Sequence, residues 1–151
     1  MIFMKSFSVR FRVSWVETDA AKVVHFSNYF RYFERAEEEF YNSLGMDFQS
    51  FSSYDIWFPR IEAYCRYLSP CKFNDLIEVT LGIDEIREKS IRYHFAVNNL
   101  TSGKKAAEGH VVIVSANIRE GQAVPLPREM VEKIKTFCDM NTEDRSMPSQ
   151  T

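Results

Sequence analysis

The chain has 151 residues, a length that fits one domain built around a single hydrophobic core, so a second domain is not expected. Hydrophobic residues make up 45% of the chain and aromatic residues 15%, with 5 Gly and 5 Pro, which argues against general disorder. The net charge is -2 at pH 7 without a long run of either sign, so nucleic acid is not expected as a partner.

A strand and a long helix are expected near the start of the chain. Apolar side chains alternate with Ser and Arg from Phe7 to Trp15, the pattern of a strand with one buried face. After a polar turn, a spacing of three or four residues predicts a helix from about Ser27 to Leu44, with the apolar stripe Tyr29, Phe33, Ala36, Phe40 and Leu44. Ser27 or Asn28 is expected to cap this helix with a side-chain oxygen, and Gly45 suits the left-handed backbone just past its end.

The strand period returns after the helix in four segments joined by polar, hairpin-like breaks. The last segment is apolar on both faces, so it should lie inside the sheet rather than at an edge. A short amphipathic helix over residues 127–137 and a polar, frayed tail over residues 139–151 complete the chain. The four strand segments are 61–67, 77–83, 91–97 and 111–114, and the breaks are 85–88 and 98–104.

This order of elements predicts a single α+β domain over residues 1–138, in which a five-stranded antiparallel sheet wraps around one long helix. That arrangement is the hotdog fold. Such a sheet leaves edge strands with unpaired backbone groups, and pairing two edges across a two-fold axis removes them. We therefore expect a homo-oligomer, either a homodimer or a homotetramer.

The turn between the first strand and the long helix is the most informative part of the sequence. It places Asp19 shortly before a helix N-terminus, whose unpaired N–H groups and positive dipole end can hold an oxyanion. A carboxylate at this position can attack a thioester carbonyl or activate water. Asp is also common in such turns for local hydrogen bonding, and the turn taken alone favours that structural role.

A wider pattern changes this balance. Residues 17–29 contain Glu-Thr-Asp, then Val-Val, His-Phe and Asn-Tyr, and the helix continues with Phe33-Glu34-Arg35-Ala36. In order and spacing, this pattern resembles the 4-hydroxybenzoyl-CoA thioesterase family. Weaker similarity extends the resemblance over roughly residues 7 to 137.

The resemblance implies roles for residues around this turn. Asp19 matches the family's catalytic aspartate, and Phe26 matches the position whose backbone N–H polarises the thioester carbonyl. His25 and Tyr29 are expected beside the substrate, and Tyr29 matches a position that supports helix packing. His25 lies one residue ahead of the histidine found in some bacterial members.

A second group of residues resembles the basic hairpin that binds CoA phosphates in this family: Arg87, Lys89 and Ser90. Within it, Glu88 stands where a second basic residue is expected. Lys22 is a further departure, because Gly is usual just before the Val-Val pair. If that Gly has positive φ, the loop backbone is expected to differ here.

Together these features predict a cytoplasmic acyl-CoA thioesterase that releases a free acid and CoA. The sequence leaves open whether Asp19 is the nucleophile or a general base, and which acyl group is removed. An acyl-carrier-protein thioesterase and a non-catalytic acyl-CoA-binding protein are the alternatives. No metal or redox cofactor is implied, since CoA is part of the substrate and three widely spaced cysteines fit neither a disulfide framework nor a zinc site. The sequence has no apolar stretch of about 18 residues, so no membrane partner is expected.

Overall fold

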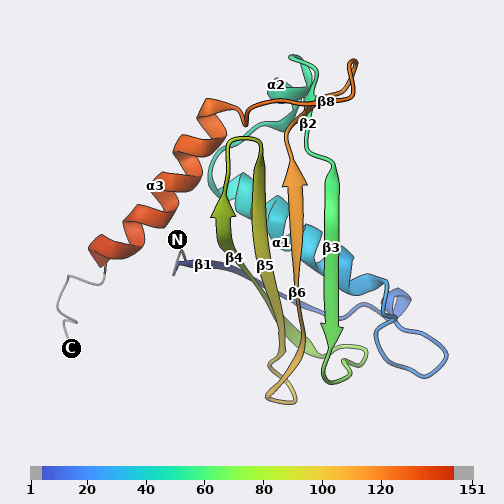
Figure 1. Ribbon diagram of the computed structural model, residues 1–151. Coiled ribbons are helices and arrows are strands. Elements are labelled where there is room, and N and C mark those ends of the chain that lie inside the picture. Colours follow the sequence, from blue (N-terminus) through green and yellow to red (C-terminus); the bar gives the residue numbers. More distant parts are fainter. Residues whose placement is uncertain (1–4, 145–151) are drawn as a thin grey trace.

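A five-stranded antiparallel sheet and the helix α1 (Asn28–Ser43), which packs on one of its faces, form the centre of the structure (Figure 1). This computed structural model describes residues 5–144, with side chains as far as residue 139. In spatial order, the strands are β1 (Ser6–Arg12), β4 (Leu76–Ile86), β5 (Ser90–Asn99), β6 (Lys104–Val114) and β3 (Arg60–Tyr67). The predicted hotdog arrangement is therefore present, and β6 lies inside the sheet as its apolar faces indicated.

The alternation of side chains on the two central strands explains the position of α1. Alternate residues of β4 and β5 have at most 2% of their surface exposed: Ile77, Val79, Leu81, Ile83, Ile91, Tyr93, Phe95 and Val97. The helix covers them with its own aromatic stripe, and the Phe33 ring stacks on Phe95 with centroids 4.6 Å apart. Burial of one such side chain stabilises the fold by about 1.5–3 kcal/mol. Gly45, with φ of 69°, ends this helical segment as expected.

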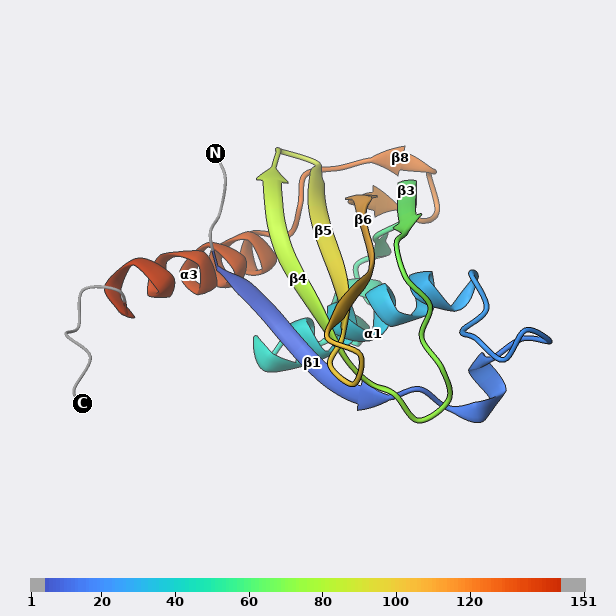
Figure 2. The same cartoon turned by 90° about the horizontal axis from the view of Figure 1, so that it is seen from below.

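Smaller elements cover the ends of the sheet. The helix α2 (Phe48–Ser52) follows α1, and a second, three-stranded sheet contains β2 (Ile56–Trp57), β7 (Ala116–Asn117) and β8 (Gln122–Ala123). Helix α3 (Arg128–Asp144) lies on the β1 and β4 side, away from β3 (Figure 2). In residues 5–144, no helix is both long enough and apolar enough to span a bilayer.

Several predicted boundaries are wrong. Strand β6 begins at Lys104 rather than at residue 111, and β4 and β5 extend into the predicted breaks. Strand β1 ends at Arg12, and Trp15 begins a 3-10 turn, η1 (Trp15–Glu17), with 79% of its surface exposed. The strand ends early because the Ser14 and Glu17 pair closes a capping box in the next turn. The last helix continues to Asp144, so residues 139–144 of the predicted tail are helical; residues 145–151 lie outside the described part of the chain.

The edge strand β3 also differs from its prediction. Its alternating residues were expected to share one buried face, but Ile61 is 65% exposed and Tyr67 is 46% exposed. Within residues 5–144, β3 pairs only with β6, and almost all of its residues are exposed. The strand has the alternation of a buried element but lacks a covering layer in the part of the chain that the structure describes.

Candidate active site

The turn that carries Asp19 is closed by its own hydrogen bonds. Asp19 Oδ1 accepts the N–H of Ala21 at 2.8 Å and, more weakly, that of Val23 at 3.5 Å. The Asp19 N–H donates to the Val23 carbonyl, and the Lys22 N–H donates to the Asp19 carbonyl, each at 2.9 Å. Lys22 has φ of 65°, so its backbone is in the left-handed conformation that Gly adopts most easily. Asp19 Oδ2 has no hydrogen-bond partner among residues 5–144, which leaves one carboxylate oxygen open.

Glu17 ties this turn to the long helix. Its carboxylate accepts the Ser14 N–H at 2.7 Å and the Tyr32 hydroxyl at 3.0 Å. Its carbonyl accepts the His25 N–H at 2.9 Å and the Asn28 side-chain amide at 2.8 Å. Burial, together with the nearby Glu17 carboxylate, raises the pKa of Tyr32, which keeps this hydroxyl a donor. The position of Asp19 relative to α1 is therefore fixed from both sides.

The start of α1 has no side-chain cap, which corrects the predicted role of Ser27 and Asn28. Ser27 occupies the cap position without a capping bond, and its hydroxyl lies 2.8 Å from His25 Nδ1 instead. The Phe26 N–H has no acceptor among residues 5–144, while the Tyr67 hydroxyl donates to the Phe26 carbonyl at 2.9 Å. An unpaired N–H at the positive end of a helix dipole is suited to an oxyanion.

His25 and Tyr29 differ in their exposure to a substrate. His25 Nδ1 accepts the Ser27 N–H at 3.3 Å, so the neutral ring has its proton on Nε2. The imidazole stacks on the Phe26 ring with centroids 4.5 Å apart. Tyr29 is only 3% exposed and contacts Tyr67 edge to face, and burial raises the pKa of its hydroxyl. Tyr29 thus supports the helix start from within the core.

The hairpin between β4 and β5 carries the other predicted residues. Arg87 is largely exposed, and its side-chain Nε lies 2.8 Å from Glu85 Oε1. Its backbone N–H donates to the Ser90 carbonyl. A groove of about 380 Å³ here is lined by two cationic and two anionic side chains, together with three uncharged residues: Arg87, Arg92, Glu62, Glu85, Ser90, Ile61 and Val112. Lys89 is exposed at the tip of the hairpin. These cations can approach an anionic ligand from solvent.

One chain does not bring Asp19 and this hairpin together. The Tyr67 end of β3 contacts Phe26 at the start of α1. The Arg60 end of β3 lies near the 87–90 hairpin, because Arg60 pairs with Ile113 of β6 and Ile113 pairs in turn with Ile91 at the start of β5. Seven residue steps along a strand span roughly 23 Å. Figure 1 shows the two regions at opposite ends of the sheet.

Residues 13–134 match the family model of the thioesterase-like superfamily. The chain belongs to this superfamily. A solved structure of the hypothetical protein AQ1494 from Aquifex aeolicus is 31% identical, with a TM-score of 0.76 over 84% of this chain and 98% of that chain. A 1,4-dihydroxy-2-naphthoyl-CoA hydrolase of Thermosynechococcus vestitus is 28% identical over 82% of this chain and 85% of its own length.

The superfamily match confirms the resemblance to 4-hydroxybenzoyl-CoA thioesterase. A structure of that enzyme in complex with 4-hydroxybenzoyl-CoA has a TM-score of 0.76 and covers 85% of this chain and 97% of that chain. At 20% sequence identity, this likeness shows the shared fold.

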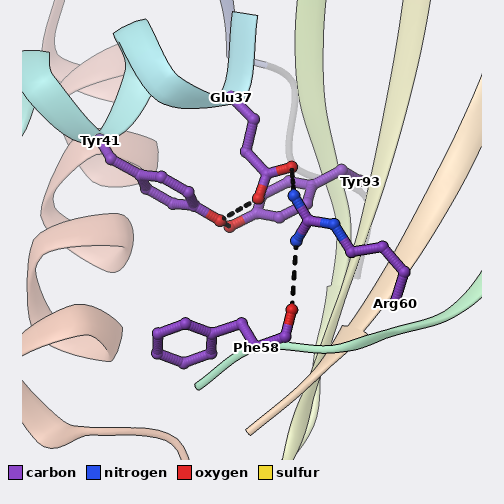
Figure 3. Close-up of polar contacts among 5 residues, drawn as sticks. All are labelled: Glu37, Tyr41, Phe58, Arg60 and Tyr93. Atoms are coloured by element: carbon purple, nitrogen blue, oxygen red, sulfur yellow. Dashed lines mark hydrogen bonds and ion pairs between the residues drawn. The ribbon is translucent and has the colours of Figure 1, made fainter. Parts of the chain in front are cut away.

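A buried polar network in this thioesterase-like chain was missed by the sequence analysis (Figure 3). Glu37 on α1 has a side chain only 4% exposed, and its Oε2 lies 2.7 Å from Arg60 Nη2 at the start of β3. The Tyr41 hydroxyl donates to Glu37 Oε1 at 2.8 Å and lies 2.9 Å from the Tyr93 hydroxyl. Burial raises the pKa of Glu37, and the guanidinium opposes that rise. A second Arg60 nitrogen lies 3.4 Å from the Phe58 carbonyl.

A positional signal for this network exists in the sequence. Glu37 lies four residues after Phe33 and four before Tyr41, on a helix row whose other members are buried. A Glu in such a row requires a partner, because an unpaired buried charge is costly. The partner, Arg60, is 23 residues away, and sequence spacing does not indicate the contact.

The network forms one wall of a cavity of about 520 Å³ beside the second half of α1. A smaller cavity of about 120 Å³ adjoins it, shares Glu34, Glu37 and Arg60, and extends toward Phe30. The larger cavity is lined by Glu34, Glu37, Glu38, Tyr41, Phe48, Trp57, Phe58, Pro59 and Arg60. Within residues 5–144, no group of three or more His, Cys, Asp and Glu side chains is arranged to hold a metal ion.

Proposed function

We propose that this protein is an acyl-CoA thioesterase in which Asp19 acts on the thioester carbonyl. The observation that carries the proposal is the pairing of a carboxylate that has an open oxygen with an uncapped helix start. Asp19 Oδ2 and the Phe26 N–H both have no partner among residues 5–144, and a few residues of hydrogen-bonded turn separate them. Relatives named as CoA-thioester hydrolases support the same chemistry.

The proposed reaction places the acyl carbonyl oxygen at the Phe26 N–H, which stabilises the charge that develops in the transition state. In one route, Asp19 Oδ2 attacks the carbonyl carbon, the C–S bond breaks, and CoA leaves as a thiolate that takes a proton. Water then hydrolyses the mixed anhydride and restores Asp19. In the other route, Asp19 removes a proton from a water molecule that attacks the same carbon, the tetrahedral intermediate collapses with cleavage of the C–S bond, and the departing CoA thiolate takes up the proton.

A dimer through β3 is part of this proposal. The strand is an unpaired edge with large exposed side chains, including Ile61 and Tyr64. Antiparallel pairing of two β3 strands about a two-fold axis places the Arg60 end of one strand beside the Tyr67 end of the other. The CoA-binding hairpin of one subunit then lies near the Asp19 turn of its partner, which completes a site that one chain leaves divided.

The test is a thiol-release assay with short, medium, long and aromatic acyl-CoAs, comparing the wild type with Asp19→Asn. We expect the variant to lose about two orders of magnitude or more in kcat, with the fold intact. Asp47→Asn is the matched control, because Asp47 also accepts the N–H of the residue two positions later, at 2.9 Å to Gln49. Asn caps a helix about as well as Asp and can accept the same N–H, so that control should keep both its stability and its turnover.

The same assay separates the alternatives. Near-normal turnover by Asp19→Asn would remove Asp19 from the mechanism. Activity on acyl carrier protein thioesters but not on acyl-CoAs would identify a carrier-protein thioesterase. Binding of acyl-CoAs without thiol release across the whole panel would identify a binding protein that retains the fold.

A further inference from the structure

We propose that the 520 Å³ cavity beside α1 receives the distal end of the acyl group and selects acyl groups that end in a cationic ammonium. This inference rests on the proposed function and names its substrate class. The volume lies in the range of about 300–1,000 Å³ that is usual for small-ligand sites.

Aromatic rings form much of the cavity wall. Phe48 is at their centre, with ring centroids 4.8 Å from Tyr41, 5.8 Å from Phe58 and 6.1 Å from Trp57, each pair close to edge-to-face. Trp57 is 49% exposed. Aromatic faces attract quaternary ammonium groups through their quadrupoles, and Trp gives the strongest attraction. The wall therefore suits either a neutral apolar group or a soft cation.

The charges around the cavity decide between these two. The cavity is lined by three carboxylates, those of Glu34, Glu37 and Glu38, against the single guanidinium of Arg60. Arg60 is held by the buried Glu37 at 2.7 Å, so its charge is already matched. Glu34 and Glu38 have no ion-pair or hydrogen-bond partner among the described residues, and both are exposed. An incoming carboxylate meets net negative charge, whereas an ammonium group is attracted.

The proposed dimer brings this cavity within reach of a short acyl group. Within one chain, Glu37 lies 11 residues after Phe26, roughly 16 Å along the helix, which only a long acyl chain can span. In the β3 pairing, the cavity lies at the Arg60 end of one subunit and faces the Asp19 turn of its partner. The acyl carbonyl and the acyl head group are then held by different subunits.

The test compares two acyl-CoAs of the same shape that differ in charge. Trimethylammoniobutanoyl-CoA carries a cation where 5,5-dimethylhexanoyl-CoA has a quaternary carbon, and adipyl-CoA supplies an anionic end. We expect kcat/KM for the cationic substrate to exceed that of its carbon isostere at least tenfold at low salt, with adipyl-CoA the poorest. Equal rates for the first two, or a preference for adipyl-CoA, would overturn the inference while leaving the thioesterase proposal intact.

Two variants locate the selectivity. The Glu34→Gln/Glu38→Gln double variant keeps the side-chain shapes and should reduce the preference to near unity. Glu39→Gln, on the same helix but outside the cavity wall, should retain it. A preference that survives the double variant would place cation recognition elsewhere and contradict this assignment.

A binding measurement covers the case in which no acyl-CoA is hydrolysed and the proposed function fails. In a Trp15→Phe background, Trp57 is the remaining tryptophan, and its fluorescence reports on the cavity wall. Tetramethylammonium should change that emission saturably, and the Glu34→Gln/Glu38→Gln change should weaken the binding at least fivefold. An unchanged emission would overturn the cavity assignment independently of catalysis.

Discussion

Removal of the Arg60 guanidinium should destabilise the fold strongly. In Arg60→Met, Glu37 keeps its hydrogen bond from the Tyr41 hydroxyl at 2.8 Å but loses the guanidinium at 2.7 Å. The Glu37 side chain is only 4% exposed, so its charge is then left buried without a cation. Removing one partner of a buried pair costs about 3–5 kcal/mol. Since Arg60 itself is 37% exposed and water can enter its place, we expect the lower end, about 3 kcal/mol. That loss corresponds to a Tm decrease of roughly 6–12 °C.

The loss should depend on pH. Burial holds the pKa of Glu37 in the folded state above its ordinary value of 4.5, so the folded state binds a proton more tightly there than the unfolded state. The corresponding stability is present below the unfolded pKa and is lost as pH rises through the folded pKa. Arg60 limits this loss by lowering the pKa. Arg60→Met should therefore change the free energy of unfolding little near pH 4 and much more near pH 7.

Urea unfolding followed by circular dichroism at those two pH values measures the difference. Arg92→Met is the control, because Arg92 makes looser contacts of 3.5 and 3.6 Å with Asp84 and Glu62 on an exposed face. Such surface pairs contribute about 0–1 kcal/mol. If Arg60→Met cost less than about 1 kcal/mol near pH 7, or the same amount at both pH values, the buried-charge reasoning would be refuted.

Three further predictions concern the turn, the hairpin and the assembly. Lys22→Gly should stabilise the fold by up to about 1 kcal/mol, because φ of 65° costs a Lys more than a Gly; a lower Tm would contradict this. Replacing Arg87 and Lys89 together by Ala should raise KM for acyl-CoA and flatten its salt dependence, and a change confined to kcat would argue against phosphate contacts. Light scattering at micromolar concentration should give at least twice the 17.7 kDa chain mass, and a monomer would exclude β3 pairing.

Periodicity predicted the core of the fold because a buried face requires apolar residues at regular spacing in the sequence. Every second residue of β4 and β5 is buried over most of their length, and the stripe of α1 from Tyr29 to Phe40 is buried as its spacing indicated. The end of β1 was not predictable in this way. Trp15 continues the apolar alternation, but the capping box of Ser14 and Glu17 turns the backbone away first.

The candidate site was only partly accessible from the sequence. The turn at Asp19 could be found because its parts are close in the chain. The Glu37 and Arg60 pair could not, because the contact depends on how β3 crosses α1. The cap at Ser27 was wrong because its hydroxyl has a nearer partner in His25, a competition that residue preferences do not resolve.

In the proposed β3 dimer, the hydrogen bond from the Tyr67 hydroxyl to the Phe26 carbonyl links the subunit interface to the proposed oxyanion site. Tyr67 belongs to the proposed interface strand and Phe26 to the proposed oxyanion site, 2.9 Å apart. We expect a β3 strand without a partner to hold this bond less firmly than a paired one. By mass action, dilution below the dimer dissociation constant should then lower specific activity, with a lag on reconcentration set by reassociation of the subunits. The amount of protein in the cell would thereby set the fraction of competent sites.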